Sequence, residues 1–570
     1  MFLRIISFIC SVVVSAALFV SCARTPQSNI LPVLTETEVI RASFDEDDYY
    51  RFYPDAVSID LSSGEPHTVS SSGAYRYSGT LENGSITVNV DKNTDDGTVF
   101  IILDNAHVKS SYAPINITEA KKVVLILENG STNTLTQTVR DIEDTSELLS
   151  GALYSKSDLT ITGKGSLDVV TDYNDGINAR DDLRITDGVI TVTAPGDGIV
   201  GKDSVCIENT VLKLTAGKDG IRSTNTDEEK GYIAIFGGTF NISANDDCVQ
   251  AVSELHIQGG DFTLISGGGF NGITGTENDM MNFGGREPDG YPKVQRHEGM
   301  PKEEAPPEGE EPREKFGNGG FPRGQRPDGM TPPEDFDNEA FTRRKMPDNI
   351  PTELPPDTSA TPESAQSQTD EDKVKAINCD GNITITDGIF KISSSHDAVS
   401  SVGNIVIDGG NFDISAGDDA IRSDASVTLN GGETVIRNSY EGVEAQNITV
   451  NGGKYNITSS DDGININQYG GMFEMSGGEI LISAGGDGID SNGSIILDGG
   501  SIVIDTSKTG RMDTPLDFEA NFENSGCTIT DIEGNDIVSS KMPIHGGFGG
   551  NRKTDNGSDK GTNVAIIREK

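Results

Sequence analysis

Short runs in which apolar and polar residues alternate recur along most of the chain, separated by glycine pairs and acidic dipeptides. Residues 404–423, "NIVIDGGNFDISAGDDAIRS", contain two such runs, and Ile421 follows an acidic corner. Alternation at i, i+2 is typical of β-strands, and glycine pairs supply the bends between them. One unit of this kind therefore predicts three short strands.

The acidic corners repeat with a period near 22 residues. Successive corners are separated by 22, 22 and 28 residues in a first series and by 22, 22, 21 and 25 in a second. The corners are Asp175, Asp197, Asp219 and Asp247, and then Asp397, Asp419, Glu441, Asp462 and Asp487. Three strands in each period predict an all-β fold, a right-handed parallel β-helix whose coils stack about 4.8 Å apart.

Stacked coils place equivalent aliphatic side chains in internal ladders. The predicted ladders are Ile185, Ile207, Ile235 and Ile257, and in continuation Ile385, Ile407, Leu429, Val450, Met475 and Leu497. We expect them to form the core of the helix.

The regular coils are expected over residues 151–275 and 374–538, after an N-terminal cap and first coils over 36–150. Between them, residues 276–373 form a Pro-, Met- and Glu-rich insertion that contains 15 of the 23 prolines and has no period, so we predict that it is disordered. The flanking runs "FNGIT" and "VKAINC" both predict the third strand of a coil, so the insertion leaves and rejoins at one corner. We expect residues 539–570 to form a flexible C-terminal tail.

The N-terminus has the pattern of an export signal. Arg4 precedes an apolar run that ends in small residues before Cys22, which predicts a signal peptide over residues 1–21. The run "LFVSC" resembles a bacterial lipobox, so we expect lipidation of Cys22, a linker over 22–35 and anchoring to the cell envelope or surface. Secretion without a lipid is the alternative.

Charge narrows the range of partners. The chain has 90 acidic and 44 basic residues and a net charge of −46. This charge repels nucleic acid and attracts divalent cations, so a direct nucleic-acid binder is not expected.

The corners carry the candidate chemistry. Like charges about 5 Å apart repel by about 3 kcal/mol at an effective dielectric constant near 20, and hard divalent cations relieve such repulsion. We therefore predict calcium binding, although single Asp-Gly corners are also ordinary turns. The candidate ligands are Asp175, Asp197, Asp219, Asp246, Asp247, Asp418, Asp419, Asp461, Asp462 and Asp487.

Two arginines occupy equivalent positions after the corners. Arg222 and Arg422 are candidates for binding the carboxylates of a uronic-acid polymer. The alternative, which we prefer, is that they form salt bridges with the acidic edge. Arg222 is also the one weak candidate for a catalytic base.

The run from Gly151 to Val205, "GALYSKSDLTITGKGSLDVVTDYNDGINARDDLRITDGVITVTAPGDGIVGKDSV", together with the later "DDGININ" and "GGDGIDSNGSIILDGG", resembles a known family. These are the secreted carbohydrate-binding β-helix proteins of anaerobic bacteria, described as binding cellulose and acidic sugars and as similar to polysaccharide lyases. The resemblance implies a right-handed parallel β-helix, calcium at the Asp-Gly-Ile corners and carbohydrate binding at a cell surface.

Three functions remain open from the sequence. The first is a surface-anchored, non-catalytic polysaccharide binder that depends on calcium and takes acidic or cellulose-like glycans. The second is a calcium-dependent polysaccharide lyase of the pectate type, and the third is a structural adhesin whose coils calcium stabilises.

Overall fold

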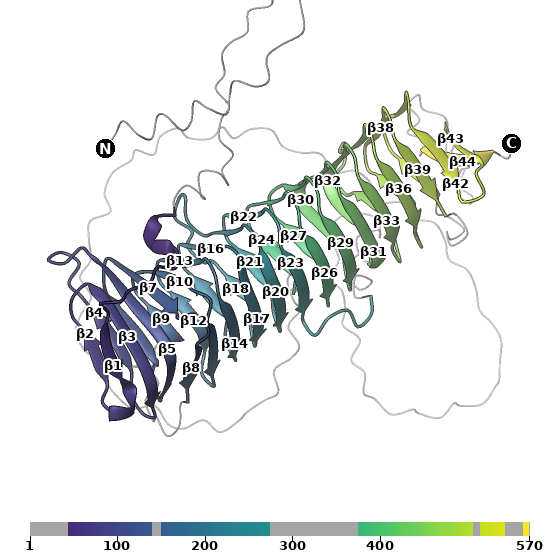
Figure 1. Ribbon diagram of the computed structural model, residues 1–570. Helices are drawn as coiled ribbons and strands as arrows, with labels where there is room; N and C mark the ends of the chain where they lie inside the picture. Colours follow the sequence, from purple (N-terminus) through teal and green to yellow (C-terminus); the bar gives the residue numbers. More distant parts are fainter. Residues whose placement is uncertain (1–43, 139–149, 274–373, 506–513, 542–562, 569–570) are drawn as a thin grey trace, which may run out of the picture. The chain divides into compact units, whose positions relative to one another are not determined.

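The computed structural model describes residues 44–138, 150–273, 374–505, 514–541 and 563–568 (Figure 1). They belong to one compact unit, and the second unit, Gly284–Ser367, lies outside them. The described residues form 44 strands and two short 3₁₀-helices, η1 (Glu46–Asp48) and η2 (Leu61–Ser63). No described helix is long and apolar enough to span a bilayer.

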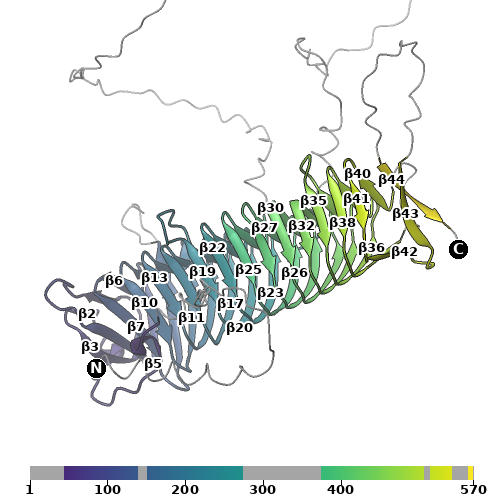
Figure 2. The same cartoon turned by 90° about the horizontal axis from the view of Figure 1, so that it is seen from above.

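The strands form three parallel stacks, and the chain visits each stack once in a coil (Figures 1 and 2). The first stack contains β1 (Val57–Asp60), β3 (Gly73–Leu81), β5 (Thr98–Ser110), β7 (Lys122–Leu127), β10 (Asp158–Thr162), β13 (Asp182–Ile185), β16 (Ser204–Ile207), β19 (Tyr232–Ile235), β22 (Glu254–Ile257), β25 (Asn382–Ile385), β28 (Ile405–Ile407), β35 (Met472–Met475), β38 (Ser494–Leu497) and β41 (Phe522–Asn524).

The second and third stacks complete each coil. The second contains β8 (Thr132–Gln137), β11 (Ser166–Thr171), β14 (Val189–Ala194), β17 (Thr210–Ala216), β20 (Gly238–Ala244), β23 (Asp261–Ser266), β26 (Ile389–Ser394), β29 (Asn411–Ala416), β31 (Glu433–Asn438), β33 (Lys454–Thr458), β36 (Glu479–Ser483), β39 (Ser501–Ile504) and β42 (Thr528–Asp531). The third contains β2 (His67–Val69), β4 (Ile86–Asn89), β6 (Ile115–Glu119), β9 (Gly151–Ser155), β12 (Asp175–Ala179), β15 (Ile199–Gly201), β18 (Ile221–Arg222), β21 (Val249–Ala251), β24 (Ile377–Cys379), β27 (Val399–Ser401), β34 (Ile464–Ile466), β37 (Ile489–Ser491) and β40 (Leu516–Phe518).

Two long strands, β30 (Ile421–Leu429) and β32 (Val443–Val450), run from the third stack into the first without a break. The fold is thus the predicted all-β parallel β-helix, with about 14 coils of about 24 residues. The average exceeds the predicted 22 because some coils carry longer loops at their corners, as between β16 and β19.

The predicted aliphatic ladders are confirmed residue by residue. Ile185 pairs with Ile207 and Ile207 with Ile235, and the same register continues to Leu497. Ile257 pairs directly with Ile385, although 128 positions separate them in the chain. The coils therefore continue across the predicted insertion as one core.

A stack of phenylalanines crosses the same junction inside the second stack. The rings of Phe240, Phe262, Phe390 and Phe412 lie parallel, with centroids 4.4–4.7 Å apart. All four are buried. Each ring packs on the ring of the preceding coil, so the stacked rings help to hold the strands of the second stack in register across this junction.

Two predictions about segment ends need correction. Only "VKAINC" contributes a third-stack strand, β24. Phe270 of "FNGIT" lies after β23 and outside any strand, and its N–H donates to Ser393 Oγ at 2.9 Å. In the C-terminal segment predicted to be a flexible tail, β43 (Asp536–Lys541) and β44 (Asn563–Arg568) instead pair antiparallel. The signal peptide 1–21, Cys22, the linker 22–35 and the insertion 276–373 lie outside the described residues.

Before the first coil, residues 44–53 run along the outside of the first stack; we call them the strap. Asp48 of the strap is 1% exposed, accepts a hydrogen bond from Thr160 Oγ1 at 2.6 Å and forms an ion pair with Lys122 Nζ at 2.7 Å. The ring of Phe44 packs edge-on against Phe236, in the coil of β19. The strap therefore covers several successive coils, a feature that the periodic pattern does not predict.

Candidate functional site

The acidic corners lie where the chain passes from the second stack to the third, and they stack as predicted. Oδ1 of Asp175 accepts a hydrogen bond from the backbone N–H of Asp197 at 3.0 Å. Oδ1 of Asp197 accepts from Asp219 at 3.1 Å, and Oδ1 of Asp219 from Asp247 at 3.0 Å. One carboxylate oxygen of each residue thus ties its coil to the next.

The bonding continues along most of the edge. Asp247 accepts from the N–H of Lys375, Asp397 from that of Asp419, and Asp462 from that of Asp487. A backbone hydrogen bond also runs in the opposite direction between these coils: the N–H of Gly198 donates to the carbonyl of Asp219 at 2.8 Å. The corner aspartates therefore help to hold successive coils of the β-helix together.

The second carboxylate oxygen of a corner residue is left for other partners. Oδ2 of Asp175 accepts from Asn178 Nδ2, and Oδ2 of Asp247 accepts from Asn378 Nδ2, each at 2.7 Å. Each asparagine stands three residues after the corner position of its own coil, which is Asp175 for Asn178 and Lys375 for Asn378, on the outer side of the third stack. This position is occupied in register by Asn178, Val200, Arg222, Gln250, Asn378, Ser400, Arg422, Glu444, Asn465, Asp490 and Asp517.

The two arginines at this position pair with the acidic edge. Arg222 lies 3.6 Å from Asp197 and 3.4 Å from Asp219. Arg422 lies 4.0 Å from Asp419 and 3.9 Å from Glu444. Both arginines therefore form the salt bridges that the preferred interpretation expects, and their binding of sugar carboxylates stays a prediction.

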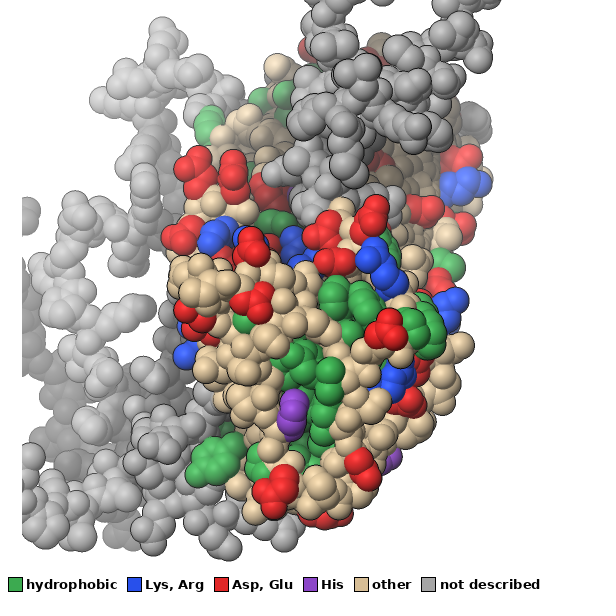
Figure 3. All heavy atoms as spheres, turned by 60° about the vertical axis from the view of Figure 1, so that its left-hand side comes forward, with side chains coloured by type: hydrophobic (Ala, Val, Ile, Leu, Met, Phe, Trp, Pro, Cys, Tyr) green, Lys and Arg blue, Asp and Glu red, His purple; other side chains and the backbone are tan. Residues whose placement is uncertain are grey.

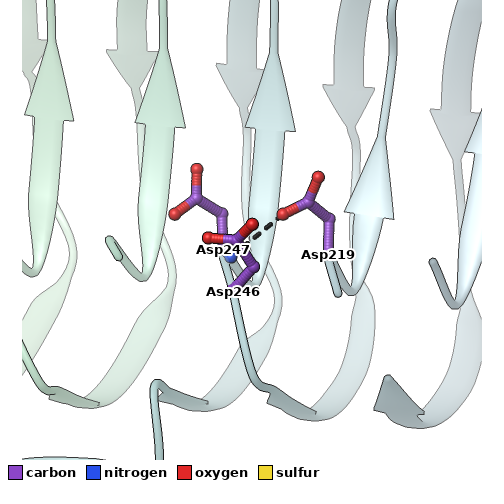
Figure 4. A group of neighbouring side chains, drawn as sticks. All are labelled: Asp219, Asp246 and Asp247. Carbon is purple, nitrogen blue, oxygen red and sulfur yellow. Dashed lines mark hydrogen bonds between the residues drawn. The ribbon is translucent and has the colours of Figure 1, made fainter. Parts of the chain in front are cut away.

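Three groups of carboxylates could hold a cation at the corners, and a fourth lies near the C-terminal coils. In each group, one ligand atom from every residue lies within 4.8 Å of the others. The groups are Asp219, Asp246 and Asp247; Asp397, Asp418 and Asp419; Asp419, Glu441 and Glu444; and Asp487, Asp490 and Asp517. Figure 4 shows the first group, in which Asp246 reaches toward Asp219 from the neighbouring coil.

One atom in the second group stands out. Asp397 is 1% exposed, and its Oδ2 has no hydrogen-bond partner among the described residues, although Oδ1 accepts from the backbone N–H of Asp419. A buried carboxylate oxygen without a partner is costly, so a bound cation or a proton is expected to satisfy it.

Burial changes the protonation of the edge. Burial, and after it the negative charge of Asp247, raises the pKa of Asp219 to about 8. Burial, and after it the negative charge of Asp461, raises the pKa of Asp462 to about 9. Burial also raises the pKa of Asp419 well above its ordinary value. Without a cation, part of this edge is therefore protonated at neutral pH.

The structure groups some of the predicted ligands and separates others. Asp219, Asp246 and Asp247 come together, as do Asp418 and Asp419, whereas Asp487 joins a group without Asp461 or Asp462. Asp175 and Asp197 belong to none of the groups found among the described residues. The prediction omitted Asp397, Glu441, Glu444, Asp490 and Asp517 as ligands; the corner period could have found the first two.

The fold and this edge define a class, the parallel β-helix proteins with a carboxylate-lined coil edge. Within it, the chain belongs to the family of carbohydrate-binding domain-containing proteins, whose model matches residues 63–420 and 418–557. A carbohydrate-binding domain-containing protein of Acetivibrio thermocellus is 45% identical over 200 residues, which are 34% of this chain and 69% of that protein. The polysaccharide lyase-like protein from C. thermocellum, solved as a gadolinium derivative, is 37% identical, with a TM-score of 0.33, over 35% of this chain and 82% of that one.

Proposed function

We propose that this protein is a non-catalytic polysaccharide-binding protein that holds calcium at its acidic edge and is anchored at the bacterial surface through Cys22. The observation that carries the calcium proposal is the buried Oδ2 of Asp397, which no described residue hydrogen-bonds and which lies beside Asp418 and Asp419. Membership of the carbohydrate-binding family supports the polysaccharide as partner.

The residues present fit a calcium ion. Ca²⁺ takes six to eight oxygen ligands in flexible geometry, and carboxylates are its preferred charged ligands. Asp397, Asp418 and Asp419 would supply such oxygens, and Oδ1 of Asp397 stays committed to the backbone of the next coil. Calcium there would supply positive charge, which could bridge to an anionic sugar.

Acidic sugars are the ligands that this arrangement favours. A chain with a net charge of −46 repels a polyanion unless cations neutralise the contact locally. Calcium bridging between protein and glycan carboxylates meets this need. Neutral, cellulose-like glucans remain the alternative within the same proposal.

The salt bridges of Arg222, the candidate base, support binding without catalysis. A lyase needs a base that is free to reach the proton beside the uronate carboxylate. The Arg222 guanidinium instead lies against Asp197 and Asp219, and its side chain is 35% exposed. We therefore rank the lyase below the binder.

A glycan-binding screen in calcium and in chelator tests the proposal. Purified mature protein should be retained on polygalacturonate or cellulose in calcium buffer, and chelation should reduce retention. An increase in ultraviolet absorbance from unsaturated product would indicate a lyase instead. Loss of thermal stability on chelation, with no glycan retained, would indicate the structural adhesin.

A further inference from the structure

The outer face of the first stack carries almost no charge in the coils of β25, β28, β30 and β32 (Figure 2). Residues alternate between the core and solvent there, and equivalent residues lie in register from coil to coil. Asp408 is the one charged residue among the outward side chains of these strands and of the residue that follows each strand. The outward side chains form three columns along the axis: Asn382, Asn404, Ser426 and Asn447; Thr384, Val406, Thr428 and Thr449; and Thr386, Asp408, Asn430 and Asn451.

Hydrogen bonds between coils fix the amide side chains of the two outer columns. Asn430 Nδ2 donates to Asp408 Oδ1 at 2.7 Å, and Asn451 Nδ2 donates to Asn430 Oδ1 at 2.8 Å. On the other side, Asn404 Nδ2 donates to Asn382 Oδ1 at 3.1 Å. An amide has two N–H donors and an oxygen with two lone pairs, so a side chain in such a row keeps further donors and acceptors for a ligand. These groups are therefore oriented before a ligand arrives.

The middle column makes the face flat. Its members are short β-branched residues that stand between the two amide columns and are partly exposed. Their methyl groups offer apolar contact, and no long side chain rises from the column. The four residues are Thr384, Val406, Thr428 and Thr449.

The same face already holds an extended chain in the N-terminal coils. The strap runs along the axis over the first stack, from the coil of β19 to that of β5. It covers Thr160 and Arg184, which are buried and belong to the same column as Thr384. The geometry of this face therefore accepts an extended chain that lies parallel to the helix axis.

Charge indicates the class of ligand. Elsewhere the surface is densely charged, and Figure 3 shows acidic and basic side chains interspersed over the N-terminal coils. Carboxylates at the borders of the face, among them Glu254, Glu474 and Asp424, repel a polyanion, as does the net charge of −46. Sugar hydroxyls donate and accept hydrogen bonds, as the amides and threonines of the face do. The pattern therefore favours a polysaccharide without charge.

We propose that the outer face of the first stack between Thr384 and Thr449 binds a neutral, linear polysaccharide that lies parallel to the helix axis, without calcium. The proposal rests on the proposed function for the polysaccharide as partner, and it assigns neutral glycans to a surface separate from the acidic edge. Coils repeat about every 4.8 Å, and an extended glucan repeats at intervals of the same order. The columns contain no aromatic side chain, so each sugar contributes little and binding accumulates over several coils.

The test measures retention of the mature full-length chain on regenerated cellulose in chelator. The double variant Val406→Arg, Thr449→Arg places long side chains on the flat face, two coils apart, and should lower the affinity about tenfold or more. The matched control Val435→Arg, Leu481→Arg adds the same charge and bulk two coils apart on the second stack and should stay within about twofold. Thermal unfolding establishes that both variants are folded.

A milder variant removes polar groups without adding bulk. Asn430→Ala, Asn451→Ala should weaken retention about fivefold, because each lost amide removes hydrogen bonds to the glycan. Because the ligand is neutral, retention of the unaltered protein should change by less than about twofold between low and physiological ionic strength. No retention of the unaltered protein in chelator, equal losses in the arginine variant and its control, or a steep fall with salt would overturn this site.

Polygalacturonate in calcium buffer separates this site from the acidic edge. The variant Val406→Arg, Thr449→Arg should retain polygalacturonate as the unaltered protein does, because the acidic edge lies between the other two stacks. If the unaltered protein retains polygalacturonate but not cellulose, the neutral site is rejected and the proposed function stands. If it retains neither polymer, both proposals are rejected.

Discussion

The backbone N–H of Asp219 donates a hydrogen bond to Oδ1 of Asp197 at 3.1 Å, so the side chain of one coil holds the backbone of the next. The same contact joins Asp197 to Asp175. It explains why carboxylates can stack at this edge despite their repulsion, because each has a fixed donor directed at one of its oxygens.

The first prediction concerns this contact. Asp197→Ala leaves the buried N–H of Asp219 without its acceptor and should lower the free energy of unfolding by about 1–3 kcal/mol. Asp197→Asn keeps an acceptor oxygen and should cost clearly less. Urea unfolding measures both, with Asp168→Ala on the exposed face of β11 as the control. Equal losses for Ala and Asn would show that the hydrogen bond does not matter.

The second prediction concerns the small residue that follows each corner. A Cβ at Gly442 would collide with the carbonyl of Gly463 and with Ile457 Cγ2. Gly442→Val should therefore destabilise the protein by about 1–3 kcal/mol through overpacking. In the same slot one coil earlier, buried Ala420→Gly should cost about 1 kcal/mol or less. Thermal unfolding checks the difference, and a tolerated valine would contradict it.

The third prediction is a pH dependence. The pKa of Asp219 is raised to about 8 in the fold, so the folded state binds a proton more tightly than the unfolded chain does. The contribution to stability is full below the unfolded pKa near 4 and is lost as pH rises toward 8, by at most about 1.4 kcal/mol per pH unit for one group. In chelator, unfolding midpoints should fall from pH 5 to pH 8, and Asp219→Asn should flatten the slope.

The fourth prediction concerns calcium. If Asp397 and Asp418 hold the ion, saturating calcium at a hundred times its Kd should stabilise the protein by about 2.7 kcal/mol per site. The double variant Asp397→Asn, Asp418→Asn should lose this gain at that site. Calorimetric titration with calcium alone counts the ions, and Asp168→Asn is the control. An unchanged ion count in the double variant would exclude this group as a ligand set.

The register of the fold could be predicted from the sequence because a parallel β-helix repeats the same environment in every coil. The pairing of Ile257 with Ile385 follows from this period alone. The direction in which a carboxylate oxygen points could not be predicted from the sequence. An aspartate can accept a hydrogen bond within its own turn or from the next coil, and both arrangements have the same sequence pattern. Glu444 was missed for a related reason: the residue three positions after a corner is an amide, an arginine, a carboxylate, a valine or a serine in different coils.

The strap shows most clearly what a period cannot predict, and it supplies the last prediction. Asp48 bonds Thr160, far along the chain, and its carbonyl accepts from Thr186 Oγ1 at 2.6 Å. Cys206, one coil after Arg184, is fully buried, and burial raises the pKa of its thiol to about 12. The Phe44 ring lies 5.7 Å from the guanidinium carbon of Arg184, which places the strap over this part of the first stack.

Asp48→Ala removes the acceptor for Thr160 and one of the two carboxylates paired with Lys122, which keeps Asp45, and should release the strap at a cost of about 1–3 kcal/mol. Cys206 should then react with a maleimide in the folded protein much faster than before, while Cys379, in the third stack, should stay unreactive. Peptide mass mapping after labelling distinguishes the two thiols. Equal labelling of both would indicate global unfolding, and labelling of neither would show that the strap is held by its aromatic contacts.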